Sequence, residues 1–264
     1  MLAASISRDF IKRARPFVLV LARDAIGVPG KLEELKRTNI PFVIVCGERG
    51  KQASNPGVRY RKPVGKWDAI NFGMQFIPQE TELVLLNDVD TRIHFLEHAL
   101  SRSTQADLVY CKVRVDEGPQ RKFYKILDPL RQRIPMAASG ELMLIKRKIL
   151  ASLTPIPPCT AEDTYLMFKA METGYHVEFC TKTYVTTVRT RDASEEEIYK
   201  TRTTLGIYQA LSLVRAPPLA RVFYYFLPVM APLLALMGAD GRAWAKGIEQ
   251  AAVNHLTKRY SMKF

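Results

Sequence analysis

The sequence predicts an α/β fold in which helices cover a mostly parallel sheet. Three apolar runs rich in β-branched residues indicate strands: residues 17–22 (FVLVLA), 41–46 (PFVIVC) and 83–86 (LVLL). Unbroken apolar runs of this length are typical of strands that are buried on both faces. Helical patterns with short connections lie between these runs. This alternation favours parallel strands joined by helices.

The remaining elements of the first 135 residues follow from the same patterns. A fourth strand is expected over residues 108–115, and residues 116–135 are basic and expected to be irregular. The expected helices cover residues 31–37, 67–76 and 96–101.

A small-residue turn at Ser139 and Gly140 precedes a further strand and helix. Glu162 and Asp163 begin another helix, which ends at Gly174, and extended structure resumes over residues 177–179. Acidic residues suit a helix N-terminus because of the helix dipole. Capping is therefore the simplest reading of the Glu162–Asp163 pair, with a catalytic role as the alternative.

The chain changes character after residue 189. Ser194, with Glu197 three residues later, resembles a capping box at the start of an amphipathic helix. The uncharged stretch 222–238 (VFYYFLPVMAPLLALMG) approaches the ~20 apolar residues of a spanning helix. Pro228 and Pro232 interrupt this stretch. It is expected to span a membrane, enter it partway or lie at its surface, or to be a buried helix of a soluble protein.

These observations divide the chain into two parts. Residues 1–192 form an expected catalytic domain that begins with a short basic helix over residues 1–15, and residues 193–264 form a membrane-associated region. The formal net charge of +13 favours an anionic partner, either nucleic acid, a phosphorylated substrate or an acidic membrane. Because no helix-turn-helix, zinc-finger or aromatic-rich binding pattern is present, nucleic acid is not expected.

Two carboxylates, Asp88 and Asp90, directly follow the strand over residues 83–86. Ligands of parallel α/β sheets bind beyond the carboxyl ends of the strands. The pair therefore either forms a solvated turn or holds something positively charged, and its position favours the second interpretation.

Four segments in fixed order resemble the family 2 glycosyltransferases of GT-A fold: GKWDAINFG, LLNDVD, SGELMLIKRKIL and AEDTYLMFKAMETGY. The resemblance covers residues 17–215. It implies that Lys66 lies near a nucleoside-diphosphate sugar, and that Asp88 and Asp90 bind a divalent metal, Mg²⁺ or Mn²⁺, on that donor. It also implies that Asp163 is the general base, with Glu162 orienting it or a neighbouring side chain.

Two segments bear on the donor. The family often has an acidic pair after the second strand, where this chain has CGERG with Glu48 alone, and the loop ARDAIG offers Arg23 and Asp24 to the base and ribose. The segment YKTRTTLG resembles the Q-R-x-R-W-x-x-G motif of the cellulose-synthase-like branch at Lys200 and Arg202, without its Gln and Trp. A solvated basic helix face is the alternative for these two residues.

The expected function is an inverting, metal-dependent glycosyltransferase at the cell membrane, with its catalytic domain on the cytoplasmic side. The expected reaction moves mannose from GDP-mannose to a lipid-linked acceptor, with transfer from a UDP-glucose donor as the runner-up. A sugar-phosphate nucleotidyltransferase is the rival enzyme, but the loop ARDAIGVPGK is a poor match to its Gly-rich basic loop. A non-catalytic GT-A-like binding module would be expected to lack the acidic residues.

Overall fold

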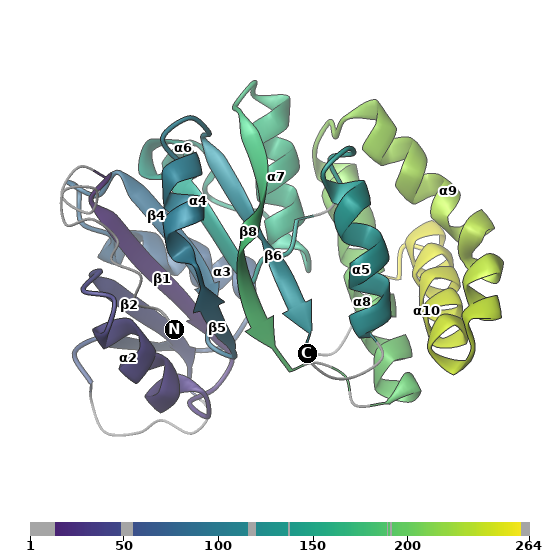
Figure 1. Ribbon diagram of the computed structural model, residues 1–264, viewed down its shortest axis with the longest axis horizontal. Helices are drawn as coiled ribbons and strands as arrows, with labels where there is room; N and C mark the ends of the chain where they lie inside the picture. The colour runs from purple at the N-terminus through teal and green to yellow at the C-terminus, as the bar shows by residue number, and fades with distance from the viewer. Residues whose placement is uncertain are drawn as a thin grey trace.

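The computed structural model describes residues 14–48, 55–115, 120–136, 138–188, 190 and 192–259. Residues 1–13 of the predicted basic N-terminal helix lie outside the described residues. These described residues form one mixed sheet of eight strands with helices on both faces, and a group of C-terminal helices lies beside the sheet (Figure 1).

The sheet has the strand order β3-β2-β1-β4-β7-β6-β8-β5. The first four strands in this order are parallel, as predicted, whereas β4–β7, β7–β6 and β8–β5 pair antiparallel and β6–β8 pair parallel. The mostly parallel sheet is thus confined to one half of the fold. The strands are β1 (Pro16–Ala22), β2 (Phe42–Gly47), β3 (Val58–Arg61), β4 (Leu83–Asp88), β5 (Thr91–His94), β6 (Leu108–Val115), β7 (Leu142–Lys146) and β8 (Val177–Thr187).

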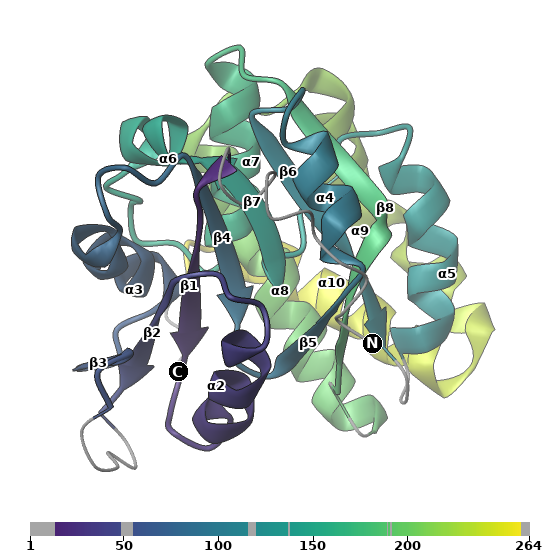
Figure 2. The same ribbon diagram turned by 60° about the vertical axis from the view of Figure 1, so that its left-hand side comes forward.

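Helices on the two faces of the sheet bury two separate apolar cores. On one face (Figure 2), α2 (Val28–Lys36) and α4 (Leu96–Arg102) pack on a core that includes Leu83 and Leu85. On the other face, α3 (Lys66–Gly73), α6 (Arg147–Leu153) and α7 (Glu162–Glu172) pack on a core that includes Val84 and Leu86. Side chains alternate along a strand. Asp88 therefore points toward the face that α7 covers.

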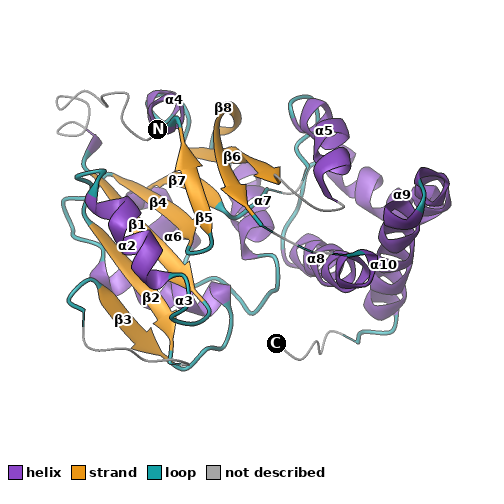
Figure 3. Cartoon of the chain, turned by 60° about the horizontal axis from the view of Figure 1, so that its bottom comes forward, coloured by secondary structure: helices purple, strands orange, loops and turns teal. Residues whose placement is uncertain are grey.

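Three C-terminal helices and α5 (Gln120–Arg131) lie together beside the sheet (Figure 3). They are α8 (Ala193–Leu213), α9 (Pro218–Leu234), extended by a 3₁₀ turn (Ala235–Met237), and α10 (Ala239–Leu256). Helix α8 is joined to the sheet because Leu205 and Tyr208 belong to the same core as α7. Gly206 permits this approach, since a Cβ at that position would lie 3.0 Å from the Ala161 backbone nitrogen.

Two expectations about local structure are wrong. Residues 116–135 were expected to be irregular, yet α5 spans Gln120–Arg131. Tertiary contacts stabilise this helix: Phe123 stacks on Trp244 at 4.0 Å between ring centroids, and Asp128 forms a 2.8 Å ion pair with Lys112. Because the segment is rich in basic residues, the helical spacing of its apolar residues was not recognised in the sequence.

The start of α8 also differs from the expectation. Asp192, rather than Ser194, caps the helix, and its carboxylate accepts the backbone N–H groups of Ser194 at 2.8 Å and Glu195 at 2.9 Å. Aspartate is as good an N-cap as serine, and Asp192 takes the position because it directly precedes the first helical residue, Ala193, whereas Ser194 lies within the first turn. Strands β3 and β5 and helix α10 were not predicted.

The apolar stretch near the C-terminus is helical and largely exposed. Within the residues that the structure describes, one stretch, Pro218–Met237, is long and apolar enough to cross a membrane, and only 17% of its most apolar window is buried. Its buried positions, Ala220, Tyr224 and Ala231, face the rest of the protein.

Candidate functional site

A cavity of about 750 Å³, called the main cavity below, lies at the carboxyl ends of β1 and β2 and beside the first turn of α7. One part of its wall comes from the sheet and α3, and the other part from α5, α8, α9 and α10. Its volume is in the range of small-molecule sites. Its position is where α/β folds bind ligands.

Glu162 and Asp163 bring two carboxylates into this cavity from the first turn of α7. The segment before the helix is fixed from two sides. Asn71 of α3 exchanges two hydrogen bonds with the Ile156 backbone, at 2.9 and 2.8 Å. The Thr160 N–H group donates to the Gln209 side chain of α8 at 3.0 Å. Both sheet-side and C-terminal helices therefore position the pair.

The Asp163 carboxylate has close backbone neighbours. It accepts the Thr164 N–H group at 2.6 Å. A Cβ at Gly140 would lie 2.8 Å from the Asp163 Cβ and 2.9 Å from its Oδ2. Only glycine leaves room for this carboxylate, so the turn at Ser139 and Gly140 shapes the site.

Burial changes the protonation of both carboxyl groups. It raises the pKa of Glu162 to about 8, an effect that Lys66 opposes and the charge of Asp163 reinforces. Burial likewise raises the pKa of Asp163, while Lys66 and the Thr164 N–H group act in the opposite direction. Two neighbouring acids that cannot both ionise easily are a common feature of acid–base sites.

Lys66 links these acids to the end of β4. Its ammonium group forms an ion pair with the Asp88 carboxylate, and its side chain is 44% exposed. Burial lowers the pKa of Lys66, but the charges of Asp88, Glu162 and Asp163 outweigh it, so the pKa lies above its ordinary value. Lys66 is therefore a firmly charged group among three carboxylates. The structure thus brings together four of the residues that the sequence analysis selected.

Further cations line the sheet side of the cavity. Arg23 follows β1, and Arg61 and Lys62 come at and after the end of β3. Arg61 is held by an ion pair with Asp68, whereas Arg23 and Lys62 are exposed and make no ion pair with any described residue. Four predicted donor-binding residues do not line the cavity: Asp24, Glu48, Asp88 and Asp90. Asp24 accepts the Ile26 N–H group at 3.0 Å within the loop, and Glu48 is exposed.

Lys200 and Arg202 both line the cavity from α8, in different settings. The Lys200 ammonium lies 3.9 Å from the centroid of the Trp244 ring. Arg202 is exposed, with its guanidinium 5.6 Å from the Tyr199 ring. Arg202 is thus the more accessible cation, and Lys200 is held against the wall.

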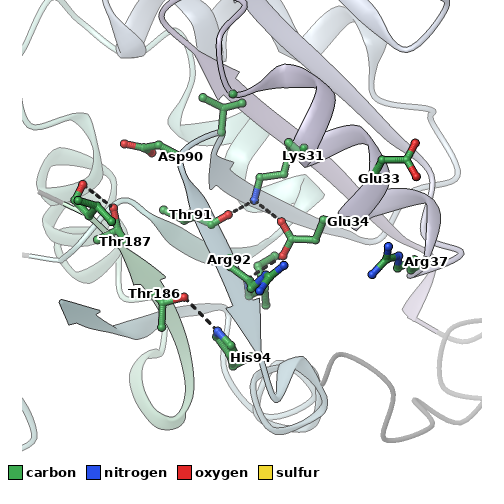
Figure 4. Close-up of a pocket in the computed structure, with 15 residues that line it drawn as sticks. Lys31, Glu33, Glu34, Arg37, Asp90, Thr91, Arg92, His94, Thr186 and Thr187 are labelled. Atoms are coloured by element: carbon green, nitrogen blue, oxygen red, sulfur yellow. Dashed lines mark hydrogen bonds and ion pairs between the residues drawn. The ribbon is translucent and has the colours of Figure 1, made fainter. Parts of the chain in front are cut away.

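Asp90 lies elsewhere. It lines a second cavity of about 690 Å³ between α2, β5 and the end of β8 (Figure 4). Lys31 lies at the base of this second cavity with its side chain fully buried, and its ammonium bonds to Glu34 Oε2 at 2.8 Å, Asn87 Oδ1 at 2.8 Å and the Thr91 carbonyl. Burial lowers the pKa of Lys31, opposed by Glu34.

The turn after β4 explains this separation of Asp88 and Asp90. The Val89 N–H group donates to the Leu21 carbonyl at 3.0 Å, and the Thr91 hydroxyl donates to the Asp88 carbonyl at 2.9 Å. The chain therefore leaves the strand direction directly after Asp88. Within the described ranges, no group of three or more His, Cys, Asp or Glu side chains is placed to hold a metal ion.

Several lining residues were not among the predicted site residues. Arg61 and Lys62 lie at a short strand whose alternating sequence VRYR was the available signal. Arg131 and Trp244 come from α5 and α10, far away in sequence, and no local pattern places them at this cavity.

Comparison with solved structures identifies the fold. The chain is similar to GalNAc-T7, solved with UDP, GalNAc and Mn²⁺, at a TM-score of 0.54 and 12% identity, over 93% of this chain and 58% of that one. Weaker similarities include the inositol-1-phosphate CTP transferase from T. maritima (TM-score 0.44, 13% identity, 65% of this chain and 88% of that one). Another is the catalytic domain of Drosophila β1,4-galactosyltransferase 7 (TM-score 0.38, 15% identity, 62% of this chain and 64% of that one).

No protein-family model matches the sequence, and the comparison with curated proteins also gives no match. The structural similarity therefore concerns the fold alone. The chain shares the GT-A fold with GalNAc-T7.

Proposed function

We propose that this protein is an inverting glycosyltransferase that uses a nucleoside-diphosphate sugar. The observation that carries the proposal is the pair of carboxyl groups from buried Glu162 and partly buried Asp163, both with raised pKa values, in a cavity that is also lined by several cations. The cations would bind a polyanionic donor, and the carboxyl pair would take the proton of a hydroxyl acceptor. The nucleotide-sugar complex of GalNAc-T7, which shares the fold, adds support.

In the proposed reaction, the acceptor oxygen forms a bond to the anomeric carbon while the bond from that carbon to the diphosphate breaks. The acceptor hydroxyl gives its proton to Asp163, and the bonding electron pair leaves with the nucleoside diphosphate. Attack opposite the leaving group in a single step inverts the anomeric configuration. Glu162, protonated up to a pH of about 8, would donate a hydrogen bond near the base without competing for the proton.

The leaving group needs positive charge, because the diphosphate becomes more negative during transfer. Lys66, Arg23 and Lys62 line the cavity where the sheet ends and would bind the diphosphate and the nucleoside. Arg202 adds a guanidinium fork at the accessible rim, suited to two phosphate oxygens. Lys200 would contribute less because Trp244 already contacts its ammonium.

A divalent metal, Mg²⁺ or Mn²⁺, is part of the proposal, as in the Mn²⁺ complex of GalNAc-T7. One or two carboxylates with phosphate oxygens are enough to hold such an ion. Asp88 fits this role because its carboxylate faces the α7 side and already holds a cation, the Lys66 ammonium. Asp90 lines the second cavity, so we assign the principal protein ligand to Asp88. The metal would neutralise charge on the leaving diphosphate.

The proposed donor is GDP-mannose, with a UDP-glucose donor as the alternative, and the proposed acceptor is attached to a lipid. The exposed apolar surface of α9 supports a position at the cell membrane. The proposed position of the catalytic domain is on the cytoplasmic side. Val222, Phe226, Val229 and Leu233 are spaced along one helix face and are 53–65% exposed.

The opposite face of α9 packs on α10, where Ala231 contacts the cluster of Ala245 and Ile248. A helix with one face on protein and an apolar outer face fits a position in the membrane surface. The exposed basic residues Arg221, Arg242 and Lys246 would attract anionic lipids there.

The test is a panel of nucleoside-diphosphate sugars, assayed with the purified protein in lipid vesicles with and without Mn²⁺. We expect release of a nucleoside diphosphate from one donor, dependent on metal, and its near loss in Asp163→Asn. Release of pyrophosphate from a nucleoside triphosphate with a sugar phosphate would instead identify a nucleotidyltransferase. Absence of any donor binding would overturn the proposal.

A further inference from the structure

The part of the main cavity that lies between the C-terminal helices is apolar. Four helices contribute to this part, which we call the apolar chamber. It is lined by Phe123 and Leu127 of α5, Ile207 of α8, Phe223 and Leu227 of α9, and Ile248 of α10. It belongs to the same cavity as Glu162 and Asp163. The polar and apolar parts of the cavity therefore form one continuous space.

These apolar side chains leave open space between the helices, although Leu227 also packs against the cluster that contains Ile248. Ile207, Phe223 and Leu227 are only partly buried, although each packs against the core beneath it. Cavities with apolar walls gain little from water, because water needs polar partners to be held there. A hydrocarbon ligand would remove this apolar surface from water at a gain proportional to the area covered.

The chamber reaches the molecular surface at apolar positions. Met237 lines it and is 42% exposed, and Leu130 lines it and is 36% exposed. Met237 also ends the apolar stretch whose outer face carries Val229 and Leu233. A hydrocarbon chain could pass from a bilayer at α9 into the chamber along apolar side chains.

Polar groups mark the inner limit of the chamber. The Lys200 ammonium lies over the Trp244 ring, and both residues line the cavity together with Ile248. A ligand with its chain among the apolar residues would thus bring its polar head to a cation, and beyond that to Asp163. This order of groups matches an amphiphile with a long hydrocarbon chain and an anionic or sugar head group.

We propose that the apolar chamber binds the hydrocarbon chain of the acceptor and thereby presents its head group to Asp163. This inference rests on the proposed function and assigns the acceptor subsite. A helix of a partner protein fits the chamber poorly, since a helix with its side chains is about 10 Å wide and four helices of this chain already form the walls.

The experiment measures binding of butyl, hexyl and octyl phosphate to the full chain by calorimetry, below their critical micelle concentrations. Each added methylene should tighten binding by up to about fourfold, the equivalent of about 0.8 kcal/mol per buried CH₂. Butyl, hexyl and octyl glucoside form the second arm, which distinguishes a phosphate head group from a sugar. Affinity that is independent of chain length in both arms would overturn the inference.

Two substitutions in α9 distinguish binding in the apolar chamber from binding to the outer face of the helix. Leu227→Trp fills the chamber and should weaken octyl phosphate binding by roughly tenfold, the equivalent of about 1.4 kcal/mol, while leaving butyl phosphate unchanged. Val229→Trp is the matched control, because Val229 is 65% exposed and does not line the cavity. Equal weakening by both would assign the binding to the outer face of α9. If Leu227→Trp does not fold, Leu227→Ala replaces it, and its larger chamber should favour longer chains.

Binding of UDP and GDP is measured in parallel. Binding that increases with chain length in a protein that binds no nucleotide would support the chamber and overturn the transferase. Nucleotide binding without any dependence on chain length would do the reverse.

Discussion

The two cavities beside β4 have opposite electrostatics. In the main cavity, the carboxyl groups of buried Glu162 and partly buried Asp163 have raised pKa values and lie near a half-exposed lysine, Lys66. In the second cavity, a fully buried lysine, Lys31, has a lowered pKa and carboxylates stand at its rim. The three N–H donors of Lys31 have three acceptors, which leaves none for a ligand.

This difference between the cavities indicates that Lys31 has a structural role and Lys66 a role in the candidate reactive site. Lys31 fixes the turn after β4, because it holds both Asn87 and the Thr91 carbonyl. Lys66, Glu162 and Asp163 line the main cavity, so a bound substrate can change their contacts and their protonation. Strand β4 thus carries a fixed structural hydrogen-bond network on one face and the candidate reactive site on the other.

The largest expected effect tests this distinction directly. Lys31→Met should destabilise the protein by about 3–5 kcal/mol, the usual cost of removing one partner from a buried ion pair. Lys66→Met should change stability much less, since Lys66 is 44% exposed, yet it should impair donor binding. Chemical denaturation of both variants compares them, and equal destabilisation would contradict the assignment of different roles.

Replacing the proposed base should leave the fold intact. Asp163→Asn is nearly isosteric, so the melting temperature should change little, while turnover should fall by roughly 10²-fold or more. Glu172→Gln, at the exposed end of the same helix, is the control. Near-normal turnover of Asp163→Asn would make Asp163 a helix-capping residue only.

Gly140→Ala should disturb Asp163 without changing any charge. The new Cβ would meet Asp163 at 2.8 Å, so the carboxylate must move, and misplacement of a catalytic group by about 1 Å can cost 10²-fold in rate. Gly30→Ala on the second-cavity side has no atom within 4 Å of its new Cβ and is the matched control. Steady-state rates of the two variants decide whether the turn at Gly140 positions the base.

Substitutions of Asp88 and Asp90 should differ in their effect on the metal dependence of donor binding. Asp88→Asn should weaken Mn²⁺-dependent donor binding by at least the 10–100-fold that loss of groups around a metal costs. Asp90→Asn should have a smaller effect, because Asp90 lines the second cavity. Calorimetry of donor binding with and without Mn²⁺ measures both, and a larger effect of Asp90→Asn would mean that the turn rearranges when the donor binds.

The dependence of stability on pH tests the raised pKa of Glu162. Because the pKa of Glu162 in the folded protein, about 8, lies above its unfolded value, the folded state binds more protons between these two pH values. Glu162 should therefore lower stability as the pH rises from about 4.5 to 8. Melting curves over this range should show a shallower decline in Glu162→Gln than in the control Glu249→Gln, an exposed position on α10. Identical declines would contradict the raised pKa.

The parts of the fold that the sequence predicted are those with strong local signals. The buried runs of β1, β2 and β4 need no distant information, because only a strand covered on both faces carries such unbroken apolar sequence. Helix α5 and strand β3 were missed. The stability of α5 depends on tertiary contacts such as the stacking of Phe123 on Trp244, and β3 is a short edge strand that pairs with β2.

The site was predictable to the same degree. Lys66, Asp88, Glu162 and Asp163 converge as expected, because each lies at the end of an element that the sequence located. The direction of Asp90 could not be predicted, since it depends on the turn that Val89 and Thr91 fix by hydrogen bonds to Leu21 and Asp88. Arg61 and Trp244 reach the cavity only through the tertiary fold.

The packing of Gly206 against Ala161 limits how this protein can be divided. Ending the chain before α8 would remove Leu205, Tyr208 and Leu211, which complete the core beneath α7. The expected division at residue 192 is therefore no cutting point for a water-soluble fragment. A fragment with an intact main cavity must also keep α9 and α10, because Phe223, Leu227 and Ile248 form part of the cavity wall.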